Sequence, residues 1–505
     1  MIRCFRRREF LKKSLGAAVL AAGVSTVPGA LLVCPWRSDV RAAEASASAR
    51  PPTDPMACYV RVSPRDPRYL ELSNGAPYIP NGLNMIHPGG DVPAARGLAE
   101  MDRWMKALAE NGGNYIRVWL SSGFWDMERQ QAGVLDEERA KRVDALLALA
   151  KKHGIRVKMT IEHFREIDPT DVRQAWASKP LHHVSRGGTA KTMSDWLAGE
   201  TSRAQFRRKL AWLQKRFGDQ PAIFGWELWN EINAVRGGDY LDWSEAMLPE
   251  LKRLFPKNLT LQSLGSFDSK WAYEPYRRLC RMRDNDIAQV HRYLDLGASL
   301  EVCHGPVDVL ASDAVRELRR YAPGRPVILA ESGAVEPRHT GPFMLYSKDK
   351  AGIILHDILF APFFAGAAGA GQCWHWGEYV DRNNLWKHFR GFGDTVAGID
   401  PPAEGFEPLM IPHPRLRIYA LKGRRTALVW CRDVENTWQM ELQQGRLPEE
   451  LKNLVISIND VLPSARCAVR IYDPWKGTWT DGAIEAGGVR LPTFSRSIVV
   501  RISTK

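Results

Sequence analysis

Short apolar runs alternate with longer amphipathic stretches through the middle of this chain, from about residue 80 to residue 400. In the longer stretches apolar residues recur at spacings of three and four, as at Leu98, Met101, Met105 and Leu108. That spacing is typical of a helix with one buried face. The short runs are continuously apolar, as expected of strands that are covered on both faces. Eight runs are predicted to be strands: 80–86, 114–121, 155–163, 223–231, 259–265, 287–294, 326–332 and 370–379.

Eight strands that alternate with helices are what a closed parallel barrel needs. We therefore predict an α/β fold, a (β/α)₈ TIM barrel, as the catalytic domain over residues 54–400. Gly112 and Gly154 stand where helix C-terminal caps are expected, just before the next strand. Ahead of the barrel, Asn74-Gly75 predicts a hairpin turn between two short β segments.

The pattern changes after Pro401-Pro402. Alternating, β-branched runs such as 426–430, 469–472 and 497–502 are separated by turn-rich pieces. This predicts a small C-terminal antiparallel β domain, sandwich-like, over residues 401–505. No internal repeat or aromatic platform stands out, so packing on the barrel is favoured over carbohydrate binding as its role.

One connection in the barrel region is unusually long. Residues 165 to 201 lie between the third strand and its helix, and they contain Trp176, His182, His183 and Trp196. Long loops on barrels commonly shape the site at the carboxyl ends of the strands. We interpret this loop as a wall of a substrate cleft; the alternative is a surface excursion.

The N-terminus has the features of a targeting segment. Arg6-Arg7-Arg8-Glu9-Phe10-Leu11 resembles the twin-arginine export motif and leads into an apolar run from Leu15 to Val33. Residues 1–45 are therefore predicted to be an export signal and linker, with cleavage between 43 and 49 and a periplasmic or extracellular destination. The alternative is an uncleaved membrane anchor.

Charge and cysteine content exclude other classes of protein. The formal net charge is +13, but residues 1 to 43 hold eight Lys/Arg and two acids, so +6 belongs to the leader and +7 remains. That charge is spread without a basic stripe, which argues against a nucleic-acid partner. The six cysteines after the leader form no CxxC pair, so no zinc site is predicted and buried free thiols are favoured.

Two of the predicted strands run out at a glutamate, Glu231 on the fourth and Glu331 on the seventh. Cleaving a glycosidic bond with retention needs two carboxyl groups about 5 Å apart, and in a barrel they come from the carboxyl ends of different strands. Glu227 is a rival acid, but it lies about 13 Å deeper at roughly 3.3 Å per residue. We expect Glu227 to be structural, with a buried partner such as an arginine.

The Asn230-Glu231 pair closing strand four and the lone Glu331 closing strand seven resemble glycoside hydrolase clan A, nearest to family 5 and its mannanases and cellulases. The resemblance covers roughly residues 66 to 395. It implies that Glu231 is the general acid/base, that Glu331 is the nucleophile, and that Asn230 binds the hydroxyl next to the anomeric carbon. Ile232 departs from the family pattern, since many relatives have proline there.

Other positions match the family site one at a time. Arg117 on strand two resembles the arginine that holds the nucleophile ionised; the alternative is a salt bridge at the barrel mouth. His291 and Tyr293 on strand six resemble residues that line the cleft and orient the nucleophile. His163, at the end of strand three, is either a substrate ligand or a structural histidine.

Two tryptophans, Trp374 and Trp376, are predicted on one face of strand eight and compete to be the sugar-stacking platform, with Trp374 favoured. Glu162, Glu378 and Asp381 also lie near strand ends and could contact sugar.

Together these residues predict a retaining glycoside hydrolase, a monomer without metal or cofactor, acting on β-linked hexosides of the β-mannan or β-glucan type. Its expected partners are the polysaccharide substrate and the twin-arginine export machinery. Two alternatives remain: a non-catalytic polysaccharide-binding protein on the same fold, and a transglycosylase with the same residues.

Overall fold

The computed structural model describes residues 54–90, 92–163, 167, 180–218, 220–235, 237–461, 466–485 and 487–504. The predicted export signal of residues 1–45 lies outside the described residues and stays a prediction. The described residues all belong to one compact unit. Among their helices, none combines the length and the apolar character that crossing a membrane requires.

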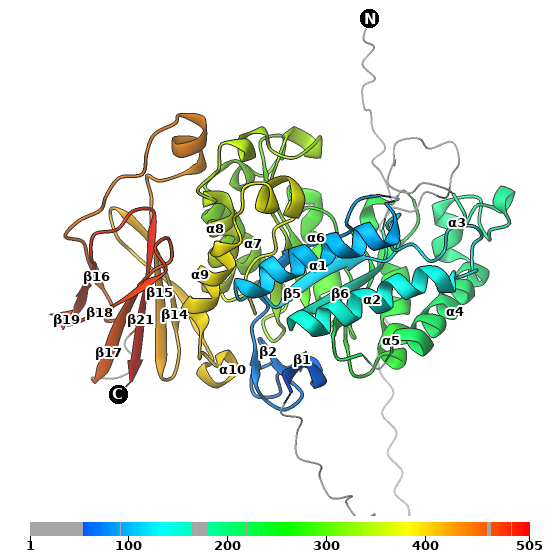
Figure 1. Cartoon of the computed structure of the whole chain (residues 1–505), viewed down its shortest axis with the longest axis horizontal. Coiled ribbons are helices and arrows are strands. Elements are labelled where there is room, and N and C mark those ends of the chain that lie inside the picture. The colour runs from blue at the N-terminus through cyan, green and yellow to red at the C-terminus, as the bar shows by residue number, and fades with distance from the viewer. Residues whose placement is uncertain are drawn as a thin grey trace, which may run out of the picture. The chain divides into compact units, whose positions relative to one another are not determined.

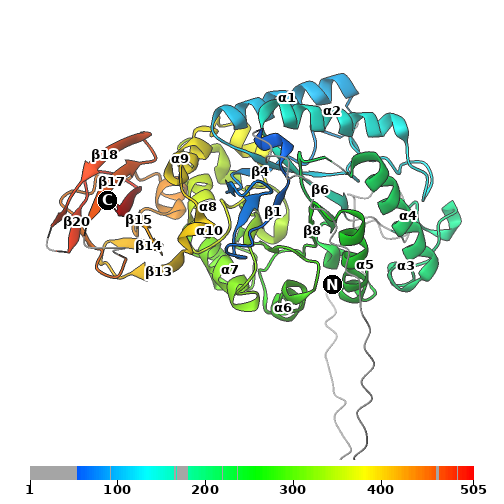
Figure 2. The same ribbon diagram turned by 90° about the horizontal axis from the view of Figure 1, so that it is seen from below.

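Parallel strands form the centre of this unit (Figures 1 and 2). Five of them are neighbours in chain order: β4 (Gly82–Asn84), β5 (Tyr115–Trp119), β6 (Arg156–Glu162), β7 (Ile223–Trp229) and β8 (Leu259–Leu261). A second parallel pair consists of β9 (Ala288–His291) and β11 (Val327–Glu331), extended by β10 (Leu294–Asp295) and β12 (Ala334–Val335). The ring closes at Cys373, which pairs in parallel with Leu83 and with Ser332. These pairings and the fold of its structural neighbours confirm the TIM barrel.

The eighth segment differs from the prediction of a strand over 370–379. Its backbone bonds alternately to both neighbours, with Gln372 N donating to Leu329 O at 2.9 Å and Asn84 N donating to Cys373 O at 2.9 Å. After Trp374 the chain turns into a π-helix, Trp376–Asp381, whose residues Tyr379 and Val380 are buried. The prediction of a strand through 379 was wrong because a short run rich in aromatic residues, such as Trp374, Trp376 and Tyr379, has the same local pattern in either conformation.

The helices surround the strands, as Figure 2 shows. Their bounds are α1 Ala94–Glu110, α2 Glu137–His153, α3 Met193–Ala198, α4 Glu200–Phe217, α5 Tyr240–Leu254, α6 Tyr273–Arg281, α7 Val307–Tyr321, α8 Ile353–Phe364, α9 Lys387–Val396 and α10 Pro401–Glu404. Helix α2 shows why these segments begin and end where they do. The Asp136 carboxylate accepts from the N–H groups of Glu138 and Arg139, and the left-handed Gly154 (φ 68°) ends the helix as predicted.

A small antiparallel sheet lies across the amino ends of the barrel strands. Strands β1 (Val60–Val62), β2 (Leu70–Leu72) and β3 (Pro77–Tyr78) form it, and Gly75 (φ 88°) makes the predicted hairpin turn. Their apolar side chains share one core with Tyr115 and Phe224 from the first residues of β5 and β7. This end of the barrel is therefore filled, which leaves the carboxyl ends of the strands for a site.

The C-terminal residues form two antiparallel sheets. The larger has the strand order β13 (Glu407–Ile411), β14 (Leu416–Lys422), β15 (Thr426–Asp433), β21 (Ser497–Thr504), β17 (Cys467–Asp473) and β18 (Thr478–Gly482). The smaller has the order β16 (Val455–Ser457), β20 (Gly488–Arg490) and β19 (Ile484–Glu485). Ile456 and Val489 of the small sheet share a core with Val429 and Val500 of the large one. The predicted antiparallel β structure is confirmed.

The other face of the large sheet packs on the barrel. Tyr419, Trp430 and Val499 belong to the same apolar core as helices α8 and α9. Every residue of α8 is buried, as expected of a largely apolar helix that lies between the strands and a sheet, and its two polar side chains, His356 and Asp357, are hydrogen-bonded to Ser497 and Arg432. The described structure thus supports the packing role that the sequence favoured for this region.

Candidate active site

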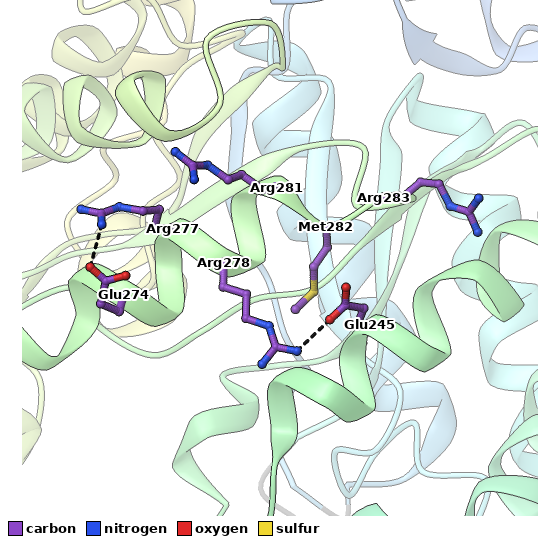
Figure 3. A pocket seen from close by; sticks show the side chains of 7 residues that line it. All are labelled: Glu245, Glu274, Arg277, Arg278, Arg281, Met282 and Arg283. Atoms are coloured by element: carbon purple, nitrogen blue, oxygen red, sulfur yellow. Dashed lines mark hydrogen bonds and ion pairs between the residues drawn. The ribbon is translucent and has the colours of Figure 1, made fainter. Parts of the chain in front are cut away.

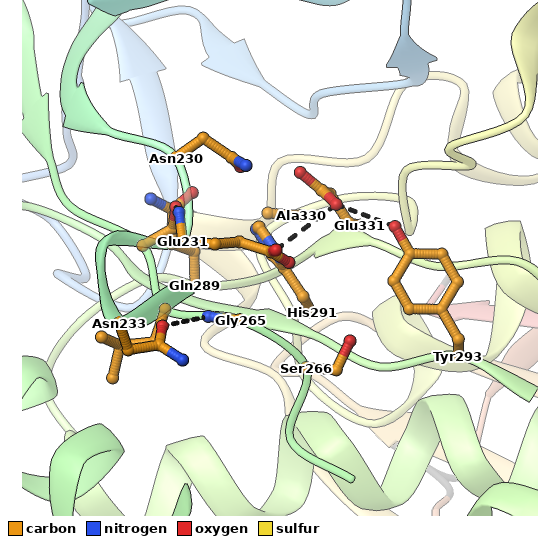
Figure 4. Close-up of polar contacts among 12 residues, drawn as sticks. Asn230, Glu231, Asn233, Gly265, Ser266, Gln289, His291, Tyr293, Ala330 and Glu331 are labelled. Atoms are coloured by element: carbon orange, nitrogen blue, oxygen red, sulfur yellow. Dashed lines mark hydrogen bonds and ion pairs between the residues drawn. The ribbon is translucent and has the colours of Figure 1, made fainter. Parts of the chain in front are cut away.

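Two carboxylates face each other where the barrel strands end. Glu231 follows β7, and Glu331 is the last residue of β11. One carboxylate oxygen of each, together with a ring nitrogen of His291, lie within 4.8 Å of one another. Figure 4 shows these side chains converging with Tyr293. The separation agrees with the 5 Å predicted for a retaining pair, and it is far from the roughly 9 Å that an inverting pair would show.

Glu331 is held by two donors. The Arg117 guanidinium bonds to its Oε1, and the Tyr293 hydroxyl donates to its Oε2 at 2.8 Å. Burial raises the pKa of the Glu331 carboxyl, while the Arg117 charge and the Tyr293 hydrogen bond act against that rise. Both residues therefore lie where the sequence predicted, beside the candidate nucleophile, and they favour its ionised form.

Glu231 has a different environment. Its carboxylate Oε1 lies 2.7 Å from Nδ1 of His291, and the pKa of that histidine is held well below its usual value by burial and by the Arg117 charge. Burial, and then the negative charge of Glu331, raise the pKa of Glu231 well above its usual value. Glu231 also adopts a left-handed backbone (φ 48°), which is rare for a residue with a side chain and occurs at functional sites. The environment of Glu231 thus favours a protonated acid, whereas Arg117 and Tyr293 favour an ionised Glu331.

Beneath the pair, Arg117 joins the site to the barrel interior. Its Nε and Nη2 donate to Glu227 Oε2 at 2.9 and 2.6 Å, and Nη2 also donates to Asn230 Oδ1 at 2.6 Å. Glu227 is completely buried; burial alone would raise the pKa of its carboxyl, but the Arg117 and Lys158 charges outweigh this and lower it to about 2. The structural role predicted for Glu227, with an arginine partner, is confirmed.

The two glutamates open into a pocket of about 710 Å³. Trp374 and Trp376 both line it, with ring centroids 5.9 Å apart and planes at 89°. Trp376 is the first residue of the π-helix, so the prediction that both lie on one face of a strand was wrong. His163 is buried behind Trp119, with the two rings stacked at 4.8 Å, and it is not among the pocket-lining residues.

The family model for cellulase (glycosyl hydrolase family 5) matches residues 88–351, which is just over half of the 505-residue chain. This chain belongs to glycosyl hydrolase family 5.

Known proteins agree with that family. The chain is 28% identical over 175 residues to "Probable mannan endo-1,4-beta-mannosidase F" of Emericella nidulans, covering 32% of this chain and 38% of that relative. It is 26% identical over 337 residues to mannan endo-1,4-beta-mannosidase 3 of Oryza sativa subsp. japonica, covering 61% of this chain and 68% of that relative. A family 5 glycoside hydrolase structure from Bacteroides vulgatus aligns over 88% of this chain and 93% of its own, with a TM-score of 0.54 and 13% identity, and so supports the fold.

Several residues of this family 5 pocket were missed from the sequence. His87 directly follows the first predicted strand, so its position at a strand end could have identified it. Asn233, Trp271 and His339 lie in single 3₁₀ turns within the connections, Ile232–Ala234, Lys270–Ala272 and Pro337–His339, which are too short for a periodic pattern to point to them. Of the three extra acids, only Glu378 lines the pocket. Glu162 is paired with Lys209 and Asp381 with Arg103.

The long connection after β6 is described only in part. Residues 180–201 contribute nothing to the pocket lining, and Trp196 instead packs on Trp229 and Trp243 at 5.6 and 5.8 Å. The prediction of a cleft wall is therefore wrong for this part, because its aromatic side chains are buried against α5 and β7. Trp176 lies outside the described residues.

Two groups of described residues have the spacing to hold a metal ion: Glu231 with His291 and Glu331, and Asp268 with Asp295 and His339. In the first group the Arg117 guanidinium already bonds to Glu331, so a cation there would meet a positive charge. In the second, Asp295 Oδ1 accepts from two backbone N–H groups, at 2.7 and 3.0 Å. Hydrogen bonds and ion pairs within the protein therefore engage acids of both groups.

A second hollow lies on the outer side of the barrel, between α5 and α6 (Figure 3). Four arginines line it, but Arg277 is paired with Glu274 and Arg278 with Glu245, each at 2.7 Å. Both glutamates of the lining are thus engaged by arginines, and Arg281 and Arg283 leave the lining with a positive excess. This hollow has no features of glycoside chemistry.

Proposed function

We propose that this chain is a retaining glycoside hydrolase that cleaves β-linked hexosides, with Glu231 as general acid/base and Glu331 as nucleophile. The observation that carries the proposal is the pair of carboxylates within 4.8 Å of each other, one held by Arg117 and Tyr293 and the other beside a neutral histidine. Double displacement requires two carboxyl groups about 5 Å apart whose environments keep one protonated and the other ionised.

In the first step an oxygen of Glu331 attacks the anomeric carbon while the bond from that carbon to the leaving oxygen breaks. Glu231 gives its proton to the leaving oxygen, so the negative charge passes from Glu331 to Glu231. In the second step Glu231 takes a proton from water, the water oxygen attacks the anomeric carbon, and Glu331 leaves as a carboxylate. Asn230, fixed by Arg117, is available for the hydroxyl next to the anomeric carbon.

The proposed substrates are β-mannan or β-glucan polysaccharides and their oligosaccharides. Support comes from the tryptophans of the pocket, since a flat ring can stack on the apolar face of a hexose. The Emericella relative is named a probable mannan endo-1,4-beta-mannosidase and the rice relative a mannan endo-1,4-beta-mannosidase, so β-mannan is the first substrate to test.

Azide rescue of two alanine variants tests the roles of the glutamates. Glu231→Ala can still form the glycosyl-enzyme from a dinitrophenyl β-glycoside, because this leaving group needs no proton, but the intermediate should accumulate. Azide should then restore turnover and give a β-azide product. Glu331→Ala lacks the attacking oxygen, so azide can only attack the opposite face and give an α-azide.

The opposite assignment of products would show that the two roles are reversed. Absence of rescue in both variants, combined with absent hydrolysis of any β-hexoside by the unmodified enzyme, would instead favour a non-catalytic polysaccharide-binding protein.

We also propose that the protein is exported as a monomer through the twin-arginine route. The supporting feature is Arg7-Arg8 ahead of the apolar run that ends at Val33. The double substitution Arg7→Lys, Arg8→Lys should leave the protein in the cytoplasm; normal export of that variant would contradict the route.

A further inference from the structure

The barrel interior directly below the catalytic carboxylates is charged. Arg117, Lys158 and Glu227 project from β5, β6 and β7, and none of the three is exposed to solvent. The apolar core shared with β1–β3 fills the amino end of the barrel, so these charges lie between a dry core and the site. Charges buried in this way are tolerated only when they are balanced and hydrogen-bonded.

Each oxygen of the Glu227 carboxylate has its own set of partners. Oε2 accepts from Arg117 and, at 2.5 Å, from the Thr160 hydroxyl. Oε1 accepts from Gln289 Nε2 at 2.7 Å and lies 3.7 Å from Lys158 Nζ. Lys158 in turn donates to Gln289 Oε1 at 2.7 Å. Gln289 therefore ties the lysine and the glutamate into one network.

Removing Lys158 would leave Arg117 as the one cation of this network for two carboxylates, Glu227 below it and Glu331 above it. Lys158 interacts electrostatically with Glu227, Arg117 and Glu331. Its charge also acts on His291 of β9. His291 is neutral because burial and the Arg117 charge lower its pKa. Burial lowers the pKa of Lys158 to about 7, against the attraction of Glu227 and Glu331, so at pH values below 7 Lys158 is the second positive charge of this layer.

We propose that Lys158 is a positioning residue of the catalytic centre, which balances Glu227 so that the charge of Arg117 acts on the nucleophile Glu331. The inference rests on the proposed roles of Glu231 and Glu331. It goes beyond them because Lys158 belongs to no motif that identified the site.

The charges balance at both stages of the reaction. Below pH 7 and before the first step, Arg117 and Lys158 carry two positive charges and Glu227 and Glu331 carry two negative ones, with Glu231 protonated. After it, Glu331 is a neutral ester and Glu231 has lost its proton, so the sum is again zero. Without the Lys158 charge the layer has a negative excess throughout, which makes both catalytic carboxyls bind protons more tightly.

The test is the pH profile of kcat/KM for a dinitrophenyl β-hexoside, whose acidic limb reports the ionisation of Glu331 in the free enzyme. Lys158→Met should move this limb upward by about one pH unit, as expected when a unit charge within about 10 Å is removed at an effective dielectric constant near 20. Glu227→Gln should move it downward, because it removes a negative charge. The double variant should return the limb close to its original position.

Lys209→Met is the matched control. Lys209 is also a buried lysine bound to two acids, with Nζ 2.8 Å from Glu128 and in contact with Glu162, but it lies on α4. Its loss should lower stability and leave the limb unmoved. Lys158→Gln, which keeps a polar group toward Gln289, serves as a second variant and must move the limb in the same direction as Lys158→Met.

An unchanged acidic limb in both Lys158 variants would overturn the inference, as would failure of the Glu227→Gln change to cancel that of Lys158→Met. If neither lysine variant folds, the acidic limb of Glu227→Gln is the remaining test. A limb that does not move downward in that variant contradicts the inference. A failure of the proposed function looks different, because Glu331→Ala would then retain full turnover of the same substrate.

Discussion

Within the described residues, two buried clusters of arginine and carboxylate can be compared, and one of them is the candidate active site. In the barrel, Arg117 bonds to Glu227 and to Glu331. Between the barrel and the C-terminal sheet, Arg432 Nε donates to Asp357 Oδ1 at 2.8 Å. All five side chains are at least nine-tenths buried. Burial and ion pairing by themselves therefore do not identify a catalytic centre.

The clusters differ in how their acids are paired with arginines and in whether they open into a pocket. At the interface each acid has its own arginine, and Asp308 accepts from Arg417 Nε at 2.6 Å and from the Tyr419 hydroxyl at 2.8 Å. In the barrel, a second glutamate faces Glu331 without an arginine of its own, and both open into the pocket. A shifted pKa is not sufficient evidence either, because burial raises the pKa of Asp357 to about 6 although it only joins two parts of the fold.

The largest effect should come from Arg117→Met. This change removes the donor that holds Glu331 ionised and frees Asn230, and it leaves Glu227 buried with one cation fewer. We expect kcat/KM to fall by about 10³-fold or more, roughly 4 kcal/mol of lost transition-state stabilisation. Steady-state kinetics on protein verified as folded by circular dichroism would measure it. Turnover within tenfold of the unmodified enzyme would contradict the role given to Arg117.

Arg432→Met should separate the clusters most clearly. It leaves Asp357 buried without its cation, which typically lowers the free energy of unfolding by about 3–5 kcal/mol. Because the interface is remote from the pocket lining, kcat/KM at a temperature where the variant is folded should change less than twofold. Urea unfolding and kinetics on one preparation test both parts. A large loss of kcat/KM with normal stability would mean that the interface controls the site.

Asp357→Asn should then alter how stability depends on pH. The folded pKa of about 6 lies above the ordinary 3.8, so the folded state binds this proton more tightly than the unfolded state. The stabilisation is complete below pH 3.8 and is lost as pH rises through 6, by about 2–3 kcal/mol. In Asp357→Asn that decline should be absent. Denaturant unfolding between pH 4 and 7.5 would show it, and equal slopes in both proteins would contradict the assignment.

The comparison also shows what the sequence could predict. Strand period and barrel geometry bring strand ends together, so Glu231, Glu331, Arg117 and Tyr293 could be placed from their positions on predicted strands. The depth of Glu227 followed from the same geometry. Strand spacing and barrel closure placed the two glutamates at strand ends and Glu227 below them. The roles of the glutamates and the choice of Arg117 and Tyr293 came from the resemblance to glycoside hydrolase clan A.

Loop residues could not be placed in the same way. His339 reaches the pocket on a left-handed backbone (φ 58°) after Arg338, whose N–H donates to Asp295 at 3.0 Å. Such a contact joins residues 43 positions apart and leaves no local pattern. The prediction for the end of the eighth segment failed for a related reason. Tyr379 of the π-helix is buried and its hydroxyl accepts a hydrogen bond from the N–H of Leu355 on α8, a contact that local sequence does not show.

The smallest free-energy change should come from Trp374→Ala, and a comparison with Trp430→Ala contrasts the two regions once more. Trp374 lines the pocket and is partly exposed, whereas Trp430 is fully buried between the large sheet and α8. Trp374→Ala removes a stacking surface for a hexose and should lower kcat/KM on oligosaccharides by about tenfold, near 1.4 kcal/mol, mainly through KM. Trp430→Ala should leave KM unchanged and lower the free energy of unfolding by about 3–5 kcal/mol, because a large core side chain is lost. Trp376→Ala decides which ring is the platform: an increase in KM larger than that of Trp374→Ala would transfer the role to Trp376, and an unchanged KM in both variants would remove sugar stacking from this wall of the pocket.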